Sequence, residues 1–346
     1  MFIADTAGGK IPSGFLLHRT GLTFKNLHYI VRIDGKYKKH IRIRRVYMKV
    51  IFIFIDGIGT GNKNRDTNPI YAAHTQVLSN MIDNARFTAD ASMGVPGLPQ
   101  SATGQTAIFT GINAPAVLNR HLSGQPTVTL KKLIQDINIF GQLMKKGLTV
   151  TNANVYRDEY LANMLEVKDR RNRPSVTSVM GMAENIKFRN VKDFMENNGV
   201  YHDITGDILK ESGYEVDVIS PEEAAQNLYR LSRQYDFTLY EHFITDYAGH
   251  KFEMDRATEV VVNLDRFLGK LVDMLDFEQE DVLIITSDHG NLEDISVRTH
   301  TMNRVPVIVK GKKAEQVEKE INSLVDIMPF VMELFRRELD GNDKEN

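Results

Sequence analysis

The chain has no cysteine among its 346 residues, and this absence limits the chemistry of any metal site. Disulfides and thiolate ligands are excluded, so a bound metal must use Asp, Glu, His and hydroxyl groups. Such ligands suit Mn²⁺, Mg²⁺ or a histidine-rich Zn²⁺ site. The sequence also has no apolar run of the roughly 18 residues needed for a membrane helix, and no signal-peptide pattern. We therefore expect a cytoplasmic protein that has no membrane partner.

The charge is unevenly distributed along the chain. The net charge is −2, yet residues 1–47 contain ten Lys or Arg against two Asp, which gives this segment a charge of +8. A nucleic-acid-binding arm is one interpretation. The segment lacks a repeated basic and aromatic pattern, and Met48 directly precedes an apolar run. We expect no nucleic-acid partner and predict that residues 1–47 are an upstream extension, outside the natural protein, that packs poorly and adds little stability.

Apolar runs that alternate with helical patterns predict the fold class. Residues 50–55 form a continuous apolar run, which is typical of a buried parallel strand. Alternation of strands and helices predicts an α/β fold with a doubly wound, mostly parallel sheet and helices on both faces. The expected strands are 50–55, 148–151, 237–244, 282–287 and 305–309, and the expected helices are 68–81, 104–109, 130–145, 221–234, 256–275 and 324–337.

The pattern changes after about Tyr156, where a polar and basic stretch is followed by short helices. We interpret residues 156–215 as a small cap inserted into the core. The core then comprises residues 48–155 and 216–339, and residues 340–346 are expected to form a disordered tail.

Metal-competent side chains follow several of the apolar runs. Asp288 and His289 end the strand predicted at 282–287, and the ends of strands in open α/β sheets are where ligands bind. Asp246 and His250 are four residues apart, so one helical turn brings them to the same face. Two ions roughly 4 Å apart can clamp the oxygens of a phosphoryl displacement. Two candidate metal sites follow: Asp246, His250 and His300, and Asp56, Asp288 and His289.

A candidate nucleophile lies between these segments. Ser101 follows a loop rich in Gly and Pro and precedes a predicted helix, so its hydroxyl could face a phosphate at the helix N-terminus. Metal coordination would activate this otherwise weak nucleophile. Thr103 is the alternative nucleophile and a candidate for substrate binding.

Together these patches resemble a known family. In order they are Asp56 in Asp-Gly-x-Gly, Ser101, Asp246-x-x-Gly-His250, Asp288-His289-Gly-Asn and His300-Thr-x-Asn-x-Val-Pro. They resemble the alkaline phosphatase superfamily, nearest its branch of cofactor-independent phosphoglycerate mutase and phosphopentomutase. The resemblance covers about residues 48–335. It implies two metal ions, the first bound by Asp246, His250 and His300 and the second by Asp56, Ser101, Asp288 and His289, with Ser101 transiently phosphorylated.

Two departures from the mutase pattern affect the expected reaction. Gln105 follows Gly104 where those mutases have histidine, and the cap is smaller than a mutase cap. A small cap favours transfer of the phosphoryl group to water. We therefore expect a two-metal phosphohydrolase that acts on a small phosphorylated metabolite. The alternatives are a phosphomutase, a phosphodiesterase and a catalytically inactive metal-binding module, although every expected ligand position is present.

Two residues of the predicted cap are further candidates for substrate binding. Arg157 could bind a substrate phosphate through charge-assisted hydrogen bonds, although a solvated surface charge is the more common role. His202 could reach the site, but a packing or surface histidine is the favoured interpretation. The ligand set suits both Mn²⁺ and Zn²⁺, and the lack of an export signal favours Mn²⁺.

Overall fold

The structure is a computed structural model that describes residues 17–19, 28–33, 37–42, 48–166 and 173–344. The chain divides into two compact units, Met1–Tyr47 and Met48–Asn346. In the first unit, β1 (Leu17–Arg19), β2 (His28–Ile33) and β3 (Tyr37–Arg42) form an antiparallel sheet in that order. The rest of this unit lies outside the described residues. The expectation that residues 1–47 pack poorly and add little stability therefore stays a prediction.

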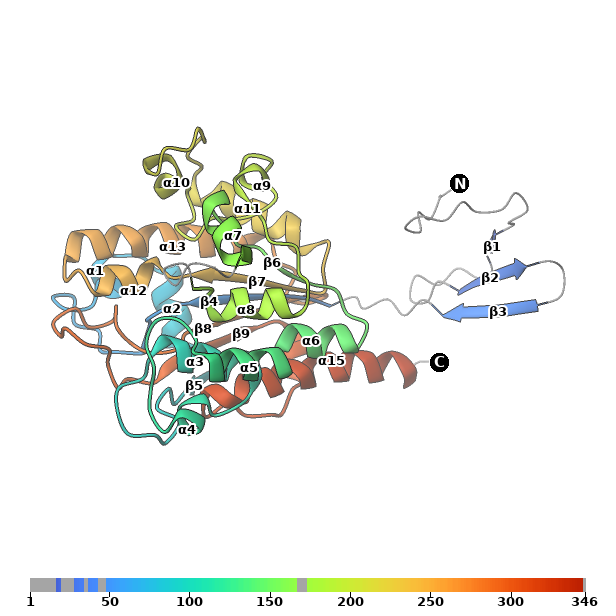
Figure 1. Cartoon of the computed structure of the whole chain (residues 1–346), viewed down its shortest axis with the longest axis horizontal. Helices are drawn as coiled ribbons and strands as arrows, with labels where there is room; N and C mark the ends of the chain where they lie inside the picture. Colours follow the sequence, from blue (N-terminus) through green and yellow to red (C-terminus); the bar gives the residue numbers. More distant parts are fainter. Residues whose placement is uncertain (1–16, 20–27, 34–36, 43–47, 167–172, 345–346) are drawn as a thin grey trace. The chain divides into compact units, whose positions relative to one another are not determined.

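The second unit is built on a six-stranded sheet with the order β5-β9-β8-β4-β7-β6 (Figure 1). Its parallel part pairs β4 with both β7 and β8, and β7 with β6. Two antiparallel pairs, β8 with β9 and β9 with β5, complete one edge. The mostly parallel α/β fold is thus confirmed. The strands are β4 (Lys49–Ile55), β5 (Phe87–Ala89), β6 (Val150–Asn152), β7 (Phe237–His242), β8 (Asp281–Thr286) and β9 (Val305–Lys310).

Alternate side chains of the central strand β4 pack against different helices. Ile51 and Ile53 belong to the core cluster that includes α11 (Pro221–Ser232) and α13 (Met254–Met274). Phe52 and Phe54 point to the opposite face, where both rings contact Phe109 with centroids 5.8 and 6.0 Å apart. Because successive side chains of a strand alternate between faces, an uninterrupted apolar strand requires helices on both. Phe109 lies on α3 (Ser101–Thr110), and α15 (Ile327–Lys344) also packs beside α3 (Figure 1).

Two helices expected to be continuous are broken. The segment 68–81 forms α1 (Pro69–Ala72) and α2 (Val77–Asp83), because His74 between them has a φ of +52°. The segment 130–145 forms α5 (Val128–Asp136) and α6 (Ile139–Lys145). The break is at Ile137, which is extended, and the Asn138 side chain then accepts a hydrogen bond from the Gly141 N–H to cap α6.

Helix α15 is longer than expected. It continues through Lys344, so it runs well into the segment 340–346 that was predicted to be a disordered tail. The last two residues lie outside the described part of the chain. Short helices α4 (Ala114–Leu118), α12 (Ile244–Gly249) and α14 (Lys312–Glu315) complete the core. Among the described residues, no helix has both the length and the apolar character required to cross a bilayer.

The described residues of the predicted cap form four short helices. They are α7 (Asp158–Glu166), α8 (Val176–Ala183), α9 (Val191–Met195) and α10 (Asp207–Glu211). A small apolar cluster that includes Phe194, Tyr201 and Leu209 holds part of this region together. Helix α8 instead packs against α5 of the core. The bounds of the cap therefore remain a prediction, and residues 167–172 within it are not described.

Candidate metal centre

The candidate ligands lie at the carboxyl ends of the three central strands. Asp56 follows β4, Asp288 and His289 follow β8, and Asp246 lies on α12, which begins two residues after β7. The carboxyl ends of parallel neighbours meet at one edge of a sheet, which brings these side chains together. The strand expected to extend to residue 244 ends at His242, and Asp246 lies on α12, one helical turn before His250.

A glycine turn allows two of these segments to approach closely. Gly57 has a φ of +71°, and a Cβ at this position would lie 2.8 Å from Asp246 Oδ1. Any other residue would therefore be strained and would also collide with a candidate ligand. The Asp-Gly step after β4 is thus required by the packing of the site.

Asp56, Asp288 and His289 form what we call the buried cluster. His289 Nε2 lies 3.3 Å from Asp56 Oδ1 and 3.7 Å from Asp288 Oδ2. Burial raises the pKa of Asp56 well above its usual range, and the charge of Asp288 adds to this effect. Burial and the charge of Asp246 raise the pKa of Asp288 to about 7. Two carboxylates are therefore held in a dry site where they repel each other.

Asp246, His250 and His300 form what we call the open cluster. His250 Nε2 lies 3.4 Å from Asp246 Oδ2 and 3.2 Å from His300 Nε2. The His250 side chain is 43% exposed, whereas that of His300 is 6% exposed. Burial of Asp246 disfavours its charge, but the hydrogen bond from His250 and the charge of His289 outweigh this and lower its pKa to about 2. This carboxylate is therefore ionised at all ordinary pH values.

Both clusters fit divalent cations. In each of them three ligand atoms lie within 4.8 Å of one another. Asp56 Oδ1 is buried and accepts no hydrogen bond from any described residue, although it faces His289 Nε2. The oxygen and imidazole donors are those that Mn²⁺ and Zn²⁺ accept. A cation in the buried cluster would also remove the repulsion between Asp56 and Asp288.

Neighbouring polar groups orient the candidate ligands. The Gln105 side-chain amide donates to Asp56 Oδ2 at 3.4 Å and to Asp288 Oδ2 at 3.2 Å. The Asn291 amide donates to Asp246 Oδ1 at 2.7 Å. Such contacts fix the direction of ligand lone pairs. Neither role was predicted: Asn291 stood within the Asp-His-Gly-Asn motif without an assigned partner, and Gln105 was noted only for replacing a histidine.

A buried glutamate holds the loop after β8 in place. Glu293 accepts hydrogen bonds from the backbone N–H groups of Gly59 and Asn291, both at 2.8 Å. The Asn303 side chain donates to the same carboxylate at 3.0 Å, and Thr301 also contacts it. Glu293 thereby connects the loops that carry Asp56, His289 and His300. No sequence spacing indicated this role, because the partners of Glu293 include backbone N–H groups and lie on three separate loops.

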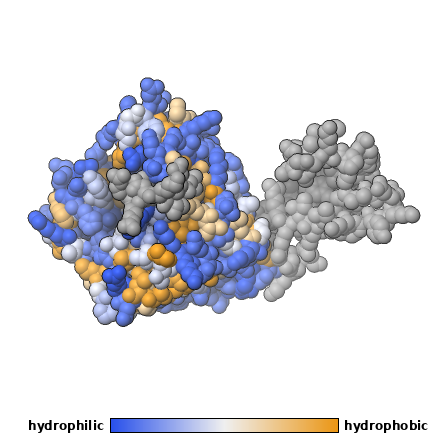
Figure 2. Space-filling view, in the orientation of Figure 1, coloured by the Kyte–Doolittle hydropathy of each residue, from blue (hydrophilic) through white to orange (hydrophobic). Residues whose placement is uncertain are grey.

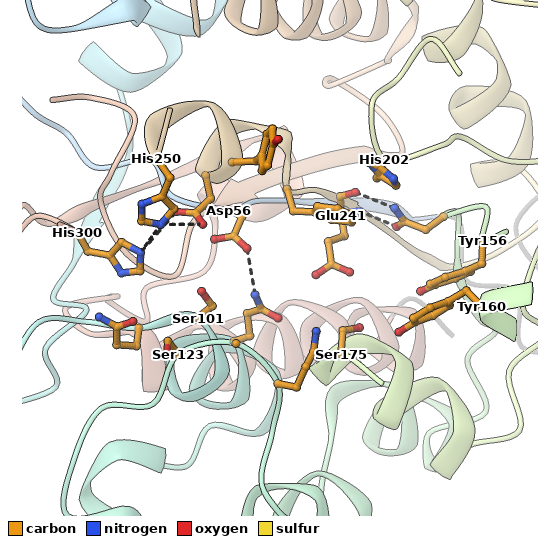
Figure 3. Close-up of a pocket in the computed structure, with 18 of the residues that line it drawn as sticks. Asp56, Ser101, Ser123, Tyr156, Tyr160, Ser175, His202, Glu241, His250 and His300 are labelled. Carbon is orange, nitrogen blue, oxygen red and sulfur yellow. Dashed lines mark hydrogen bonds and ion pairs between the residues drawn. The ribbon is translucent and has the colours of Figure 1, made fainter. Parts of the chain in front are cut away.

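Ser101 is the first residue of α3 and lies against the buried cluster. Its Oγ is 3.0 Å from His289 Nε2, and Figure 3 shows it facing Asp56 and His300 across the cavity. Its position at the positive end of a helix suits a nucleophile that attacks a phosphoryl group. Thr103 does not take part: its side chain is fully buried, and its hydroxyl donates to Gln100 O and accepts from Leu122 N–H. The expectation that Thr103 binds substrate or acts as the nucleophile is therefore wrong.

A cavity of about 830 Å³ opens from the clusters toward the predicted cap. Arg157 and His202 both line it, and their role in substrate binding stays a prediction. The His202 ring stacks on Phe243 with centroids 4.2 Å apart. Burial lowers the pKa of His202 to about 3, so this ring stays neutral and serves packing at the cavity wall. Figure 2 shows the surface of this unit as a mixture of polar and apolar residues.

The fold and these clusters define a class: an α/β protein with two candidate divalent-metal sites beside a serine. The chain belongs to the Metalloenzyme superfamily, because the family model of that name matches residues 48–339. The resemblance to the alkaline phosphatase superfamily near its phosphoglycerate mutase branch is thereby confirmed. The family also supports the expectation of an enzyme that uses divalent metals.

Two curated relatives carry the name of a mutase. A 2,3-bisphosphoglycerate-independent phosphoglycerate mutase from Clostridioides difficile (strain 630) is 27% identical over 219 residues, which cover 58% of this chain and 42% of the relative. An enzyme of the same name from Clostridium novyi (strain NT) is 32% identical over 110 residues, which cover 30% of this chain and 21% of the relative. The matched region thus spans less than half of the length of these relatives.

A solved structure agrees with the fold. The PH0037 protein from Pyrococcus horikoshii is similar with a TM-score of 0.51 and 17% sequence identity. The similarity covers 84% of this chain and 97% of that one. At this identity the likeness shows a shared fold.

Proposed function

We propose that this protein is a two-metal phosphohydrolase that removes phosphate from a small phosphorylated metabolite through a phosphoserine at Ser101. The observation that carries the proposal is the position of the Ser101 hydroxyl. It lies 3.0 Å from His289 Nε2, at the first residue of α3, where the helix N-terminus, together with a cation held by the buried cluster, would favour a bound phosphoryl group. Mn²⁺ and Zn²⁺ are the candidate ions.

When bound at the two clusters, divalent ions would polarise the phosphoryl oxygens and lower the pKa of a hydroxyl or water beside them. The residues of the chain then have separate roles. Ser101 Oγ attacks phosphorus, which forms the Oγ–P bond and breaks the bond from phosphorus to the ester oxygen, and the proton of the serine hydroxyl passes to that departing oxygen. Water next attacks the phosphoserine, breaks the Oγ–P bond and returns a proton to Oγ, so that the serine is restored and inorganic phosphate is released.

Solvent access at the open cluster supports water as the second acceptor. The His250 side chain is 43% exposed, and Tyr247, which also lines the cavity, is 47% exposed. Ser101 lines the same cavity as these two residues, so water that enters at the open cluster could reach a phosphoryl group on Ser101. Retention and reorientation of a dephosphorylated product would require a closed site that excludes water.

A phosphomutase is the second candidate, and the relatives favour it. The 27% identity to a phosphoglycerate mutase extends over 58% of this chain. In a mutase the same phosphoserine would form, but a hydroxyl of the retained product would attack it. The two candidates therefore share Ser101 and the metal clusters, and they differ in the acceptor.

Isotope labelling separates the two candidates. Metal-loaded protein is incubated with phosphorylated sugars, phosphoglycerate and aryl phosphates in ¹⁸O-water, and the products are analysed by mass spectrometry. The phosphohydrolase predicts free phosphate as the main product, with ¹⁸O incorporated. Isomerised substrate with almost no free phosphate would replace the hydrolase by the mutase, and a lack of turnover with every substrate and metal would contradict both.

A further inference from the structure

The cavity has a second end whose chemistry differs from that of the metal clusters. Figure 3 shows Ser101, Asp56 and His300 at one end and Tyr156 and Tyr160 at the other. The Glu241 carboxylate projects between these two ends (Figure 3). A phosphoryl group held beside Ser101 would therefore direct the organic part of its substrate toward Glu241.

Glu241 is fixed in place, and part of its carboxylate remains available. The residue is 5% exposed and lies on β7. Its backbone N–H donates to Asn154 Oδ1 at 2.8 Å, and its backbone C=O accepts from the Asn154 amide at 2.7 Å. Thr177 Oγ1 donates to Oε2 at 2.7 Å and is the one described residue that hydrogen-bonds to this carboxylate. Oε1 is thus an acceptor that a ligand in the cavity can use.

Two stacked tyrosines form the wall beyond Glu241. The rings of Tyr156 and Tyr160 have centroids 5.8 Å apart and planes inclined by 8°. Ser175, whose hydroxyl caps α8, lines the same end of the cavity. A flat aromatic face beside hydroxyl and carboxylate groups is suited to a compact ligand that has both C–H and O–H groups.

The charges of the cavity select among ligands. Of the described residues that line it, Arg157 alone carries a guanidinium or ammonium group. Burial raises the pKa of Glu241 to about 7. Above this pH, a substrate with a carboxylate or a second phosphate beside Glu241 would bury two like charges, which is unfavourable. Arg157 is exposed, so water screens its charge. Neutral hydroxyl groups avoid the repulsion between like charges and can donate to the free oxygen of Glu241.

We infer that Glu241 is a specificity-determining residue that accepts hydrogen bonds from the hydroxyls of a sugar or other polyol monophosphate, and that it rejects phosphates whose organic part carries a carboxylate. The inference rests on the proposed function for the position of the phosphoryl group. It goes further because it states the class of the leaving group. A site that depends on a buried acceptor discriminates against ligands that lack the matching donor.

A comparison of kcat/KM values among four substrates tests this inference. The kcat/KM values of the metal-loaded protein are measured at pH 8, above the raised pKa of Glu241, for glucose 6-phosphate, 3-phosphoglycerate, phosphoethanolamine and phenyl phosphate. Glucose 6-phosphate is expected to be the best of the four. Glu241→Gln should lower the ratio of kcat/KM for glucose 6-phosphate to that for 3-phosphoglycerate by about tenfold or more, mainly through KM, because a hydrogen bond to a charged group has at least this effect.

Glu215→Gln provides the matched control. It makes the same chemical change at an exposed residue that does not line the cavity, and it should leave the ratio unchanged. An equal loss for all four substrates in Glu241→Gln would show a structural role and overturn the inference. So would 3-phosphoglycerate or phosphoethanolamine as the preferred substrate of the unchanged protein.

A binding measurement separates this inference from the proposed reaction. In a Ser101→Ala background, calorimetry should show that adding Glu241→Gln weakens glucose 6-phosphate binding by about tenfold and leaves 3-phosphoglycerate binding equal or tighter. Glu241→Gln could weaken glucose 6-phosphate binding as expected while the unsubstituted protein releases no phosphate. This result would contradict the hydrolase but support the subsite. Identical affinities with and without Glu241→Gln would overturn the subsite.

Discussion

The buried and open clusters contain the same kinds of ligand but differ in their surroundings. His289, in the buried cluster, is fully buried, whereas the His250 side chain in the open cluster is 43% exposed. The pKa of Asp288 is raised to about 7, and that of Asp246 is lowered to about 2. Two similar sets of side chains therefore have opposite charge preferences. Burial and neighbouring carboxylates disfavour the charge of Asp288, whereas the hydrogen bond from His250 and the charge of His289 favour that of Asp246.

This difference assigns a separate task to each cluster. A dry site with two repelling carboxylates binds a cation strongly and strengthens its effect on a neighbouring hydroxyl, and Ser101 lies beside His289 in that cluster. A water-accessible site can exchange its ion and supply water. Nucleophile activation is thus expected at the buried cluster and entry of water at the open one.

The largest expected effect comes from the side chain beside the buried cluster. Ser101→Ala should lower kcat by roughly 10⁴-fold, since loss of a nucleophile usually has an effect of this size, and it should leave two metal ions bound. Ser212→Ala, at an exposed serine of the predicted cap, is the control and should not change kcat. The test is steady-state kinetics together with metal analysis. Near-normal turnover by Ser101→Ala would exclude the phosphoserine route.

The second-largest expected effect is a difference between the two clusters in how fast they lose their metal ions. Dialysis against a chelator is expected to remove the open-cluster ion first, because His250 is exposed to solvent, and the buried ion later. Activity should disappear with the first ion and return when metal is added. Metal content measured by mass spectrometry against time should show two phases. A single phase in which both ions leave together would contradict the difference between the clusters.

Charge removal should change stability in opposite directions in the two clusters. In metal-free protein at pH 8, Asp288→Asn should raise the free energy of unfolding by about 1–3 kcal/mol, since it removes a buried and repelled charge. Asp246→Asn should lower it by about 1 kcal/mol, because the hydrogen bonds to its ionised form are lost. Chemical denaturation measures both values. A change in the free energy of unfolding with the same sign in both variants would contradict this prediction.

These signs follow from the direction of each pKa shift. The pKa of Asp288 in the folded state is raised, so its contribution to stability is favourable at low pH and is lost as the pH rises through about 7. The pKa of Asp246 is lowered, so its contribution is present above the unfolded pKa of about 3.9. That contribution is lost as the pH falls toward about 2.

The smallest expected difference is in the titration of two histidines. The hydrogen bond to Asp246 raises the pKa of His250, and burial lowers that of His289. In metal-free protein His250 should therefore favour folding below its unfolded pKa of about 6.5, and this gain is lost as the pH rises through its folded pKa. Protonation of His289 should oppose folding as the pH falls. NMR titration of the ring resonances tests whether the pKa of His250 lies above that of His289. A higher pKa for His289 would contradict this expectation.

Much of the fold and the site followed from local patterns. The apolar run 50–55 and the Asp-His pair after residues 282–287 predicted two central strands and the edge where the site lies, because burial and strand ends leave signals in the sequence. The helix breaks near His74 and Ile137 were missed, since they depend on single backbone conformations. The antiparallel strand β9 was also not distinguished from a parallel one, because its direction depends on distant partners.

The supporting residues were harder to predict than the ligands. Glu241 is a charged residue within the otherwise uncharged strand β7, and that contrast was the available signal. Gln105 and Glu293 act through tertiary contacts with groups far away in the sequence, which spacing does not reveal. Thr103 was overestimated because a hydroxyl near a helix start looks the same in sequence whether it faces a cavity or the interior.

Anomalous diffraction from crystals of the manganese-loaded protein would test the central claim most directly. We expect two peaks, one among Asp56, Asp288 and His289 and one among Asp246, His250 and His300, with the Ser101 hydroxyl beside the first. The peak at the buried cluster should keep full occupancy after a short soak in chelator, while the other decreases. A single peak, or two peaks away from these residues, would contradict the two-cluster site.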